Sequence, residues 1–500
     1  MTLLALKAIS LQLRDKTLLN GVDLSIQAGQ VWGLIGASGS GKSLTARTIL
    51  GLPPKGALVT GSIELKGTAL LTLDERAWCT IRGRDIGVVF QDSAAAFNPL
   101  MTVGDHVAEP LRWHLGVSQA RARQLALDAL ARAEFPASID VFARFPHELS
   151  GGQRQRAMIA AAIALSPKLL LADEPTTALD VTTQAALLGL FRTLADDEGM
   201  AVLLISHDVP AVAMVADHIA LMVSGKIVEH AATNTIAPAL APRLADLFAR
   251  SRPRPAGRLG ETGDIVLTAK HLSYAYRRKM AVHDLSFMLR RGECLGIVGQ
   301  SGSGKSTLAR MVAGLIKPST GSIEEGHATK QIQMVFQDPM GAFNPRWTLG
   351  RSIAEPLRRL TGKAVDERVV EALIEVGLDP TFAARYPHEV SGGQAQRAAI
   401  ARAIIAKPDV LVLDEPVSAL DVAIRGQILD LLDTLKSRHG LAMLFITHDL
   451  GVARSIANHV IVMQNGVIVE EGPASDVLAA PTHPYTQALV AASPSLYLRS

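Results

Sequence analysis

Residues 31–50 read VWGLIGASGSGKSLTARTIL, and a related stretch, CLGIVGQSGSGKSTLARMVAGL, begins at Cys294. Each stretch predicts an apolar strand, a glycine-rich turn and the start of a helix. Because glycine has no side chain, successive backbone N–H groups of the turn can surround an anion at the helix N-terminus. The lysine that follows can reach the β- and γ-phosphates of a nucleotide, and the next hydroxyl can ligate Mg²⁺. The sequence therefore predicts two phosphate-binding loops.

The residues expected to bind the nucleotide form one continuous run in each copy. In the first copy they are Gly36, Ala37, Ser38, Gly39, Ser40, Gly41, Lys42, Ser43 and Leu44. In the second copy they are Gly299, Gln300, Ser301, Gly302, Ser303, Gly304, Lys305, Ser306 and Thr307. Two such runs in one chain argue against a glycine turn that merely precedes a helix.

The composition fits a globular protein of two to four domains. The chain has 500 residues, of which 48% are hydrophobic, and a formal net charge of +3. This charge is small for the length, so electrostatics give little support to a nucleic-acid partner. The two cysteines, Cys79 and Cys294, are too few for a disulfide framework or a four-cysteine zinc site and favour a reducing compartment. The apolar runs fall short of the roughly 18 residues of a membrane-spanning helix.

Motif residues repeat along the chain at similar spacing, as expected for a duplicated domain. Gly36 and Gly299 are 263 positions apart, and Gln91 and Gln337 are 246 apart. Three later pairs are all separated by 241 positions: Ser150 and Ser391, Glu174 and Glu415, and His207 and His448. The decrease places an insertion in the first half around residues 65–84, which we expect to be a loop.

This repeat predicts the domain organisation and the fold class. We expect a first domain over residues 1–250, a linker over 251–264 that is rich in Pro, Gly and charge, and a second domain over 265–500. In each half short apolar strands alternate with helical patterns, as at residues 31–35 and 169–172. This alternation is typical of an α/β fold with a mainly parallel sheet covered by helices.

Two adjacent acids follow one apolar strand in each half. They are Asp173-Glu174 in the first half and Asp414-Glu415 in the second. Because side chains alternate along a strand, the two acids should point in different directions. The first acid suits the Mg²⁺ shell, and the second, Glu174 or Glu415, could polarise the attacking water as a catalytic base.

A histidine and a glutamine follow other strands and should reach the same sheet edge. His207 and His448 are expected to donate a hydrogen bond to the γ-phosphate where charge develops. Gln91 and Gln337 can meet Mg²⁺ or water through the amide oxygen, which suits a sensor better than a catalyst. The predicted Mg²⁺ ligands are therefore Ser43, Gln91, Asp173, Ser306, Gln337 and Asp414.

A second anion site is predicted in each half at the motifs LSGGQ, residues 149–153, and VSGGQ, residues 390–394. Each motif opens a long helix, and two glycines behind a serine expose N–H groups at the helix N-terminus. The residues concerned are Ser150, Gly151, Gly152, Gln153, Ser391, Gly392, Gly393 and Gln394. A serine that only caps a helix is the plainer interpretation of either motif alone.

Together these residues resemble the ATPase subunits of ATP-binding cassette (ABC) transporters over essentially the whole chain. The resemblance implies two tandem P-loop NTPase domains, each with a helical subdomain that carries the signature motif. It also implies ATP and Mg²⁺ as cofactors, with the signature of one half closing over ATP held by the other half. Residues 178–180 and 419–421 resemble the family's cross-dimer contact. Both sites contain every residue that hydrolysis requires in this family.

Two positions depart from the family pattern. The family usually stacks adenine on an aromatic residue roughly 23 positions before the phosphate loop, where Tyr276 precedes Gly299. The corresponding residue before Gly36 is Leu13. We therefore expect the first half to bind ATP about ten- to a hundredfold more weakly. The second departure, Val390 in place of leucine, keeps an apolar residue and should have no effect.

Two further stretches resemble the branch of importers that serves peptides, nickel and metal-binding opine-like ligands. Each half contains F-N-P followed by A-E-P-L, and residues 481–494 read PTHPYTQALVAASP, like the tail of that branch. In the first half the corresponding region, residues 237–252, lacks the H-P-Y-T element. The resemblance implies an importer ATPase, for peptides first and for nickel or a metallophore second. Without tail cysteines, no iron–sulfur centre is expected.

The resemblance also implies partners and a location. We expect one copy of the chain to work with two membrane-spanning permease subunits, whose cytoplasmic helices dock beside Gln91 and Gln337. An extracytoplasmic binding protein would supply the solute, which the chain itself never touches. The chain would be peripheral to the cytoplasmic face of the inner membrane and bind no nucleic acid. The alternatives are a soluble tandem ATPase acting on ribosomes or DNA and a nucleotide switch without turnover.

Overall fold

The computed structural model describes residues 2–135, 138–176, 179–252, 263–277, 279–326, 331–361, 366–418 and 420–493. The chain divides into two compact units, Met1–Leu179 with Thr183–Ser251 and Arg252–Ser500 with Asp180–Thr182. Most of the expected linker, and Ala178 and Ala419 of the loops that resemble a cross-dimer contact, lie outside the described residues. Each unit has its own sheets and its own helices.

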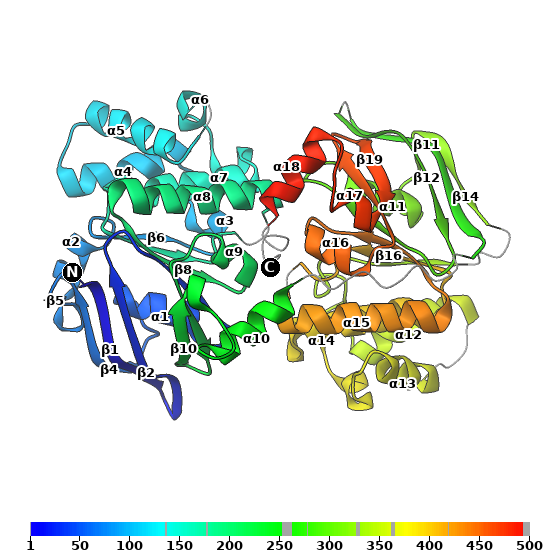
Figure 1. The fold of residues 1–500 in the computed structure, drawn as a ribbon, viewed down its shortest axis with the longest axis horizontal. Helices are drawn as coiled ribbons and strands as arrows, with labels where there is room; N and C mark the ends of the chain where they lie inside the picture. The colour runs from blue at the N-terminus through cyan, green and yellow to red at the C-terminus, as the bar shows by residue number, and fades with distance from the viewer. Residues whose placement is uncertain are drawn as a thin grey trace. The chain divides into compact units, whose positions relative to one another are not determined.

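A six-stranded sheet forms the centre of the first unit, with the order β10-β9-β3-β8-β7-β6 (Figure 1). Its strands are β3 (Val31–Ile35), β6 (Ile86–Val89), β7 (Leu169–Asp173), β8 (Ala201–Ser206), β9 (His218–Val223) and β10 (Lys226–Ala232). Neighbouring strands are parallel except β9 and β10, which are antiparallel. Strands β3 and β8 are buried along their whole length, as their continuous apolar sequences indicate.

A second, antiparallel sheet in this unit has the order β2-β1-β4-β5. Its strands are β1 (Thr2–Leu13), β2 (Lys16–Gln27), β4 (Ala57–Leu65) and β5 (Thr68–Ala69). Along β2 buried residues alternate with exposed ones from Val22 to Gln27, so one face of the sheet packs on the core.

The helices of the first unit fall into two groups. They are α1 (Lys42–Ile49), α2 (Glu75–Ile81), α3 (Ser93–Ala96), α4 (Val103–Leu115), α5 (Gln119–Arg132), α6 (Ser138–Phe142), α7 (Gly151–Ile163), α8 (Val181–Glu198), α9 (Val209–Ala213) and α10 (Pro242–Ser251), with short 3₁₀ turns at Leu70–Thr72, Pro146–Glu148 and Thr233–Thr235. Helices α4, α5 and α6 pack together, and α4 and α5 also pack on α7. Figure 1 shows this group away from β1 and β2. Together with α7 it forms a helical subdomain, and the N-terminal end of α7 carries the signature motif.

The insertion at residues 65–84 is not the loop that its polar sequence predicted. It contains β5, a 3₁₀ turn and α2, whose N-cap Asp74 accepts a hydrogen bond from the backbone N–H of Ala77 at 2.8 Å. Trp78 is buried in the core, and the Arg82 guanidinium lies over its ring. One large apolar side chain and a helix cap thus order a segment whose average composition indicates a loop.

The second unit repeats this plan. Its central sheet has the order β15-β16-β17-β13-β18-β19, and its antiparallel sheet has the order β12-β11-β14. The strands are β11 (Ile265–Tyr276), β12 (Lys279–Arg290), β13 (Cys294–Val298), β14 (Thr320–Glu325), β15 (Ile332–Val335), β16 (Val410–Asp414), β17 (Ala442–Ile446), β18 (His459–Gln464) and β19 (Val467–Pro473). The prediction of a duplicated α/β fold with mainly parallel sheets is confirmed.

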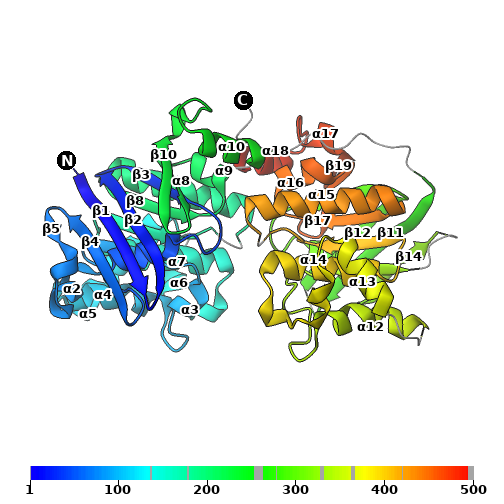
Figure 2. The same cartoon turned by 90° about the horizontal axis from the view of Figure 1, so that it is seen from below.

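The helices of the second unit follow the same arrangement. They are α11 (Lys305–Val312), α12 (Leu349–Thr361), α13 (Asp366–Glu375), α14 (Gly392–Ile404), α15 (Val422–His439), α16 (Leu450–Ile456), α17 (Ala474–Val477) and α18 (Pro484–Ala492), with 3₁₀ turns at Pro380–Ala384 and Pro387–Glu389. Helices α12 and α13 pack on α14, and Figure 2 shows them on the side of the unit away from α17.

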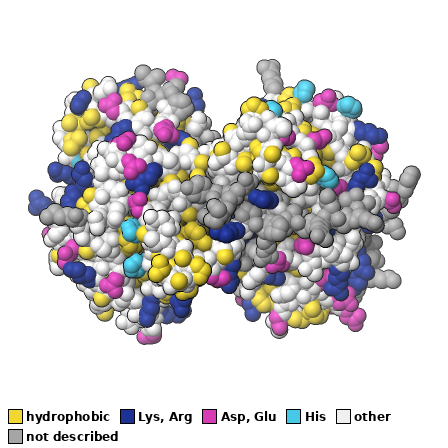
Figure 3. Space-filling model, in the orientation of Figure 1, with side chains coloured by type: hydrophobic (Ala, Val, Ile, Leu, Met, Phe, Trp, Pro, Cys, Tyr) yellow, Lys and Arg dark blue, Asp and Glu magenta, His cyan; other side chains and the backbone are white. Residues whose placement is uncertain are grey.

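Within the described ranges, every helix is too short or too polar to cross a lipid bilayer. On the face seen in Figure 3, basic and acidic side chains are interspersed in both units, as the small net charge predicts.

Candidate functional site

The two phosphate loops join β3 to α1 and β13 to α11. Gly41 and Gly304 are the N-caps of these helices and have φ angles of 110° and 103°, which favour glycine. A Cβ atom on Gly41 would lie 2.9 Å from Leu19 Cδ2, and one on Gly304 would lie 2.3 Å from the carbonyl oxygen of Ala281. The last glycine of each loop is therefore required by backbone conformation and by close packing.

A buried lysine at the end of each loop donates hydrogen bonds back to carbonyl groups at the start of that loop. Lys42 Nζ donates hydrogen bonds to the carbonyl oxygens of Gly36 at 2.8 Å and Ala37 at 2.9 Å. Lys305 Nζ donates to the carbonyls of Gly299 and Gln300, both at 2.7 Å. Burial lowers the pKa of Lys305, although the nearby acids of the site oppose this shift. A desolvated ammonium beside a glycine-rich helix N-terminus fits a bound polyphosphate.

The last residue of β7 and of β16 is an aspartate that lies against the hydroxyl following the lysine. Ser43 Oγ donates to Asp173 Oδ1 at 2.9 Å, and Ser306 Oγ donates to Asp414 Oδ1 at 3.0 Å. Burial raises the pKa of Asp173 and of Asp414, and these serine hydrogen bonds oppose the rise. Two oxygen donors beside a phosphate loop are the set that Mg²⁺ takes when substrate phosphates complete its shell. The residues present therefore fit the metal.

The second acid contacts both the glutamine and the histidine of its own half. Gln91 Nε2 donates to Glu174 Oε2 at 3.0 Å, and His207 Nδ1 lies 3.3 Å from Glu174 Oε1. In the second half Gln337 Nε2 donates to Glu415 Oε2 at 3.0 Å. His448 Nδ1 lies 3.1 Å from Glu415 Oε1. The structure thus brings together, in each half, a glutamate, a histidine and a glutamine that follow three separate strands.

Both glutamates have a backbone conformation that the sequence did not predict. Their φ angles are 46° for Glu174 and 48° for Glu415, in the left-handed region. The backbone N–H of each glutamate donates a hydrogen bond to the neighbouring strand. Glu174 N–H donates to the carbonyl of Ile205 at 2.8 Å, and Glu415 N–H donates to that of Ile446 at 3.0 Å. Such a conformation costs about 1 to 3 kcal/mol and is concentrated at functional sites. It turns the carboxylate away from the strand and toward the glutamine.

Electrostatics couple the second-half pair. Burial would raise the pKa of Glu415, but the hydrogen bond and charge of His448, together with the charge of Lys305, outweigh burial and lower the pKa. Burial would likewise lower the pKa of His448, whereas its hydrogen bond to Glu415 and the charge of Glu415 raise it. The glutamate is thereby held as a carboxylate, the form in which it can accept a proton.

The signature serines cap their helices, which is the plainer interpretation of each motif. Ser150 and Gln153 form a capping box, with Ser150 N–H donating to Gln153 Oε1 at 3.0 Å. Ser391 and Gln394 repeat it at 2.9 Å. The second glycine of each motif is fixed by packing, because a Cβ on Gly152 would lie 2.8 Å from Thr183 Cγ2.

The first glycine of each signature motif has no such neighbour. A Cβ on Gly151 or on Gly392 would meet no described atom within 4 Å. The space beside both glycines is open, and because the first N–H groups of a helix have no intrahelical partner, these N-termini are suited to bind an anion.

The predicted adenine-stacking positions are structurally equivalent. Leu13 pairs with Lys16 at the end of the hairpin β1–β2, and Tyr276 pairs with Lys279 at the end of β11–β12. Tyr276 is 45% exposed, and its ring lies edge-on to Tyr274 with centroids 4.9 Å apart. A flat aromatic surface is therefore available in the second half where the first half has an aliphatic side chain.

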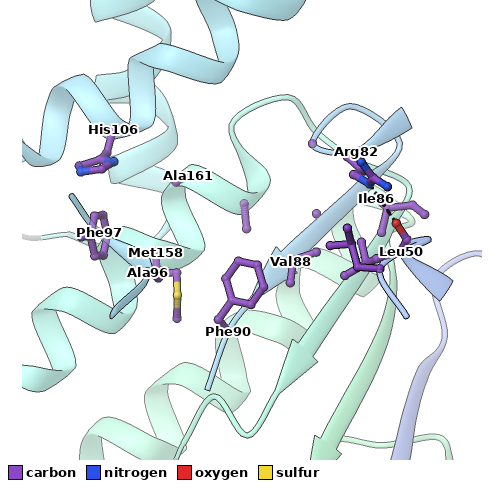
Figure 4. A pocket seen from close by; sticks show the side chains of 14 residues that line it. Leu50, Arg82, Ile86, Val88, Phe90, Ala96, Phe97, His106, Met158 and Ala161 are labelled. Atoms are coloured by element: carbon purple, nitrogen blue, oxygen red, sulfur yellow. Dashed lines mark hydrogen bonds between the residues drawn. The ribbon is translucent and has the colours of Figure 1, made fainter. Parts of the chain in front are cut away.

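A mainly apolar cavity of about 270 Å³ in the first unit is lined by residues of β6 and α7. Figure 4 shows Val88 of β6 and Phe90, just after that strand, on the side of Met158 and Ala161 of α7, with Phe97 and His106 nearby. Phe90, the residue before Gln91, is 50% exposed. The cavity is therefore lined by the residue that immediately precedes the glutamine in contact with Glu174.

One tail residue near the second site was not identified from the sequence as part of it. The Tyr485 hydroxyl accepts a hydrogen bond from the backbone N–H of Gln300 at 3.0 Å. The H-P-Y-T element indicated a family-like tail but carried no signal of this contact.

Comparisons with known proteins agree with this arrangement. The family model described as "ABC transporter" matches residues 19–177 and 282–418, and that described as "Oligopeptide/dipeptide transporter, C-terminal region" matches residues 469–499. The peptidoglycan transport ATP-binding protein YejF of Agrobacterium fabrum is 42% identical, over 94% of this chain and 92% of that protein. The glutathione import ATP-binding protein GsiA of Salmonella paratyphi A is 40% identical, over 95% of this chain and 86% of that protein.

Further similarity extends to other relatives and to a solved structure. The oligopeptide transport ATP-binding protein OppD of Mycobacterium bovis is 38% identical, over 96% of this chain and 95% of that protein. The structure of an RNase-L inhibitor has a TM-score of 0.65 and covers 94% of this chain and 90% of its own; at 20% identity it shows the fold alone. The family models and the relatives cover both halves, so the chain belongs to the ABC transporter family of ATP-binding ATPases.

Proposed function

We propose that this chain hydrolyses ATP in both halves, with Mg²⁺, and so drives the import of peptides through membrane permease subunits. The observation that best supports hydrolysis is the repeated contact of one glutamate with a glutamine and a histidine, next to a phosphate loop. A protein that only bound nucleotide would need the loop but not this cluster.

The side chains divide the work of hydrolysis. The phosphate loop and Lys42 hold the β- and γ-phosphates, and Glu174 accepts a proton from the attacking water. His207 donates a hydrogen bond to the γ-phosphate as negative charge develops there. Gln91 senses whether the γ-phosphate is present because its amide contacts the glutamate. The equivalent residues of the second half are Lys305, Glu415, His448 and Gln337.

A magnesium ion would be held by Ser43 and Asp173 in the first half and by Ser306 and Asp414 in the second. When bound, the ion neutralises charge on the phosphate oxygens and helps to orient them. Gln91 and Gln337 would reach its shell through their amide oxygens. The serine–aspartate contacts at 2.9 and 3.0 Å support this assignment.

We further propose that the signature of each half closes on the ATP held by the other half, as the resemblance implies. Ser150, Gly151 and Gly152 would meet ATP of the second half, and Ser391, Gly392 and Gly393 that of the first. The open space beside Gly151 and Gly392 supports this role, because backbone N–H groups at a helix N-terminus can donate hydrogen bonds to an anion.

The permeases and the solute follow from the tail and the relatives. Proteins of this family work with membrane permeases, and we propose that one copy of the chain serves two of them at the cytoplasmic face of the membrane. The cavity lined by Phe90, the residue before Gln91, has mostly apolar side chains around it, as expected for a surface that receives a short helix. The tail match and the relatives named for oligopeptide, glutathione and peptidoglycan transport favour peptides as the solute.

Reconstitution tests this proposal as a whole. The chain would be co-expressed with its neighbouring permeases and binding protein, inserted into vesicles, and supplied with Mg-ATP on the side that carries the ATPase. We expect uptake of a labelled peptide that stops when Glu174→Gln and Glu415→Gln are combined. Hydrolysis without peptide uptake, together with uptake of nickel or a metallophore, would refute the peptide assignment. Co-purification with ribosomes or DNA instead of permeases would refute the transport assignment.

A further inference from the structure

The tail of the second half is bonded to its own phosphate loop. Tyr485 is the second residue of α18, and its hydroxyl accepts the hydrogen bond from Gln300 N–H at 3.0 Å. The carbonyl oxygen of the same Gln300 accepts a hydrogen bond from Lys305 Nζ at 2.7 Å. One loop residue therefore connects the tail hydroxyl to the lysine that faces the phosphates.

The tyrosine is presented by a rigid helix start. Glu470 of β19 accepts hydrogen bonds from the backbone N–H of Thr482 at 2.8 Å and of His483 at 3.1 Å. The His483 imidazole caps α18 by accepting from Tyr485 N–H at 3.2 Å. Leu489, one turn further along, is buried in the core. The hydroxyl is thus held in place by the fold rather than by the contact it makes.

The first half builds the same support without the tyrosine. Helices α10 and α18 each begin at a proline, and their third residues, Leu244 and Thr486, are fully buried. Glu229 caps α10 by accepting from Leu244 N–H at 2.6 Å. The position of Tyr485 is taken by Arg243, which is exposed. Both halves thus have a helix that begins at a proline and has a glutamate contact at its start, whereas only the second half has the tyrosine.

We propose that Tyr485 is a positioning residue that anchors the phosphate loop of the second half and so raises the ATP affinity of that site alone. This inference rests on the proposed ATP site at Lys305. Without the hydroxyl, a half-buried N–H loses its partner and the first turn of the loop is less well held. Since a neutral hydrogen bond has a modest net effect, we expect ATP affinity to fall about three- to tenfold.

The test uses the full chain with one phosphate loop disabled at a time. Lys42→Ala leaves the second site for ATP, and Lys305→Ala leaves the first. We expect Tyr485→Phe to weaken ATP binding about three- to tenfold in the Lys42→Ala chain and to leave it unchanged in the Lys305→Ala chain. Affinities would be measured by calorimetry, and the melting midpoint of each variant would be recorded.

A matched control removes a different hydroxyl from the same tail. Thr482 Oγ1 donates to Glu470 at 2.9 Å and does not contact the loop, so Thr482→Val should leave both ATP affinities unchanged. Equal affinity with and without the Tyr485 hydroxyl, or an equal loss at both sites, would overturn the anchoring role. A Lys42→Ala chain that binds no ATP at all would instead refute the proposed second site, and the anchoring role with it.

Discussion

The two halves have the same glutamate, glutamine and histidine contacts, but they differ at two positions around the nucleotide site, the predicted adenine-stacking residue and the tail residue beside the phosphate loop. The glutamine–glutamate contact is 3.0 Å in both, and the histidine–glutamate contacts are 3.3 and 3.1 Å. By contrast, Leu13 ends its hairpin strand where Tyr276 ends the equivalent strand of the second half, and Arg243 stands where Tyr485 contacts a phosphate loop. The proposed hydrolytic cluster has thus been kept in duplicate, while the surroundings that set affinity have diverged.

The largest expected effect tests the likeness of the two clusters. Glu174→Gln and Glu415→Gln each keep the size of the side chain but remove the base, so hydrolysis at the altered site should fall about 10²- to 10⁴-fold. We expect the first-turnover burst of phosphate to halve to the same extent in either variant, as rapid quenching would show. A normal burst in one variant and none in the other would mean that the halves are not chemically equivalent. Unchanged ATP affinity is the control.

The next effect tests the difference between the two halves at the position expected to stack on adenine. In chains that retain only Lys42 or only Lys305, the second site should bind ATP about ten- to a hundredfold more tightly, because stacking on an aromatic ring contributes about 1 to 3 kcal/mol. Tyr276→Leu should remove the part of this difference that comes from stacking and leave the part assigned to Tyr485, and Leu13→Tyr should raise the affinity of the first site. Calorimetric titration gives both affinities. Equal affinities in the unsubstituted pair would exclude a role for Tyr276.

The smallest effect concerns pH and the second-half pair. His448 has a raised pKa, so its stabilising contribution is complete below about pH 6.5 and is lost as pH rises through the raised value. Glu415 has a lowered pKa, so its contribution is present above about pH 4.5 and is lost as pH falls through the lowered value. The melting midpoint of His448→Gln should therefore lie below that of the natural chain by a few degrees between about pH 5 and 6.

The same melting series can also contradict the proposed ion pair. Above the raised pKa of His448 the difference between the two chains should shrink. A difference that grows steadily toward alkaline pH would show that the pair is not an ion pair in the folded protein. His207→Gln, measured in parallel, reports the corresponding contact of the first half.

The fold and the main clusters could be predicted because they depend on local sequence. The apolar stretch 31–35 is β3 as expected, and the strand before Asp173 extends from Leu169 to include that acid. The serine–aspartate and glutamine–glutamate contacts follow from strand ends that share one edge of a parallel sheet. Motif spacing and strand burial were sufficient for these features.

Other features depend on tertiary contacts that no short stretch specifies. The left-handed φ of Glu174 is imposed by its hydrogen bond to the neighbouring strand, not by residue type. The insertion around Trp78 is ordered because one indole is buried, although its average composition is polar. The contact of Tyr485 with Gln300 joins residues 185 positions apart. Pattern reasoning identified the tail but could not place its hydroxyl on the loop.

The central claim is that each half hydrolyses ATP with its own glutamate as base. The most direct test is phosphate release from Mg-ATP by the Glu174→Gln, Glu415→Gln double variant, with ATP binding measured on the same sample. We predict that binding is retained and that release falls at least about a hundredfold. Release at the rate of the natural chain would contradict the account, since neither glutamate could then be the base.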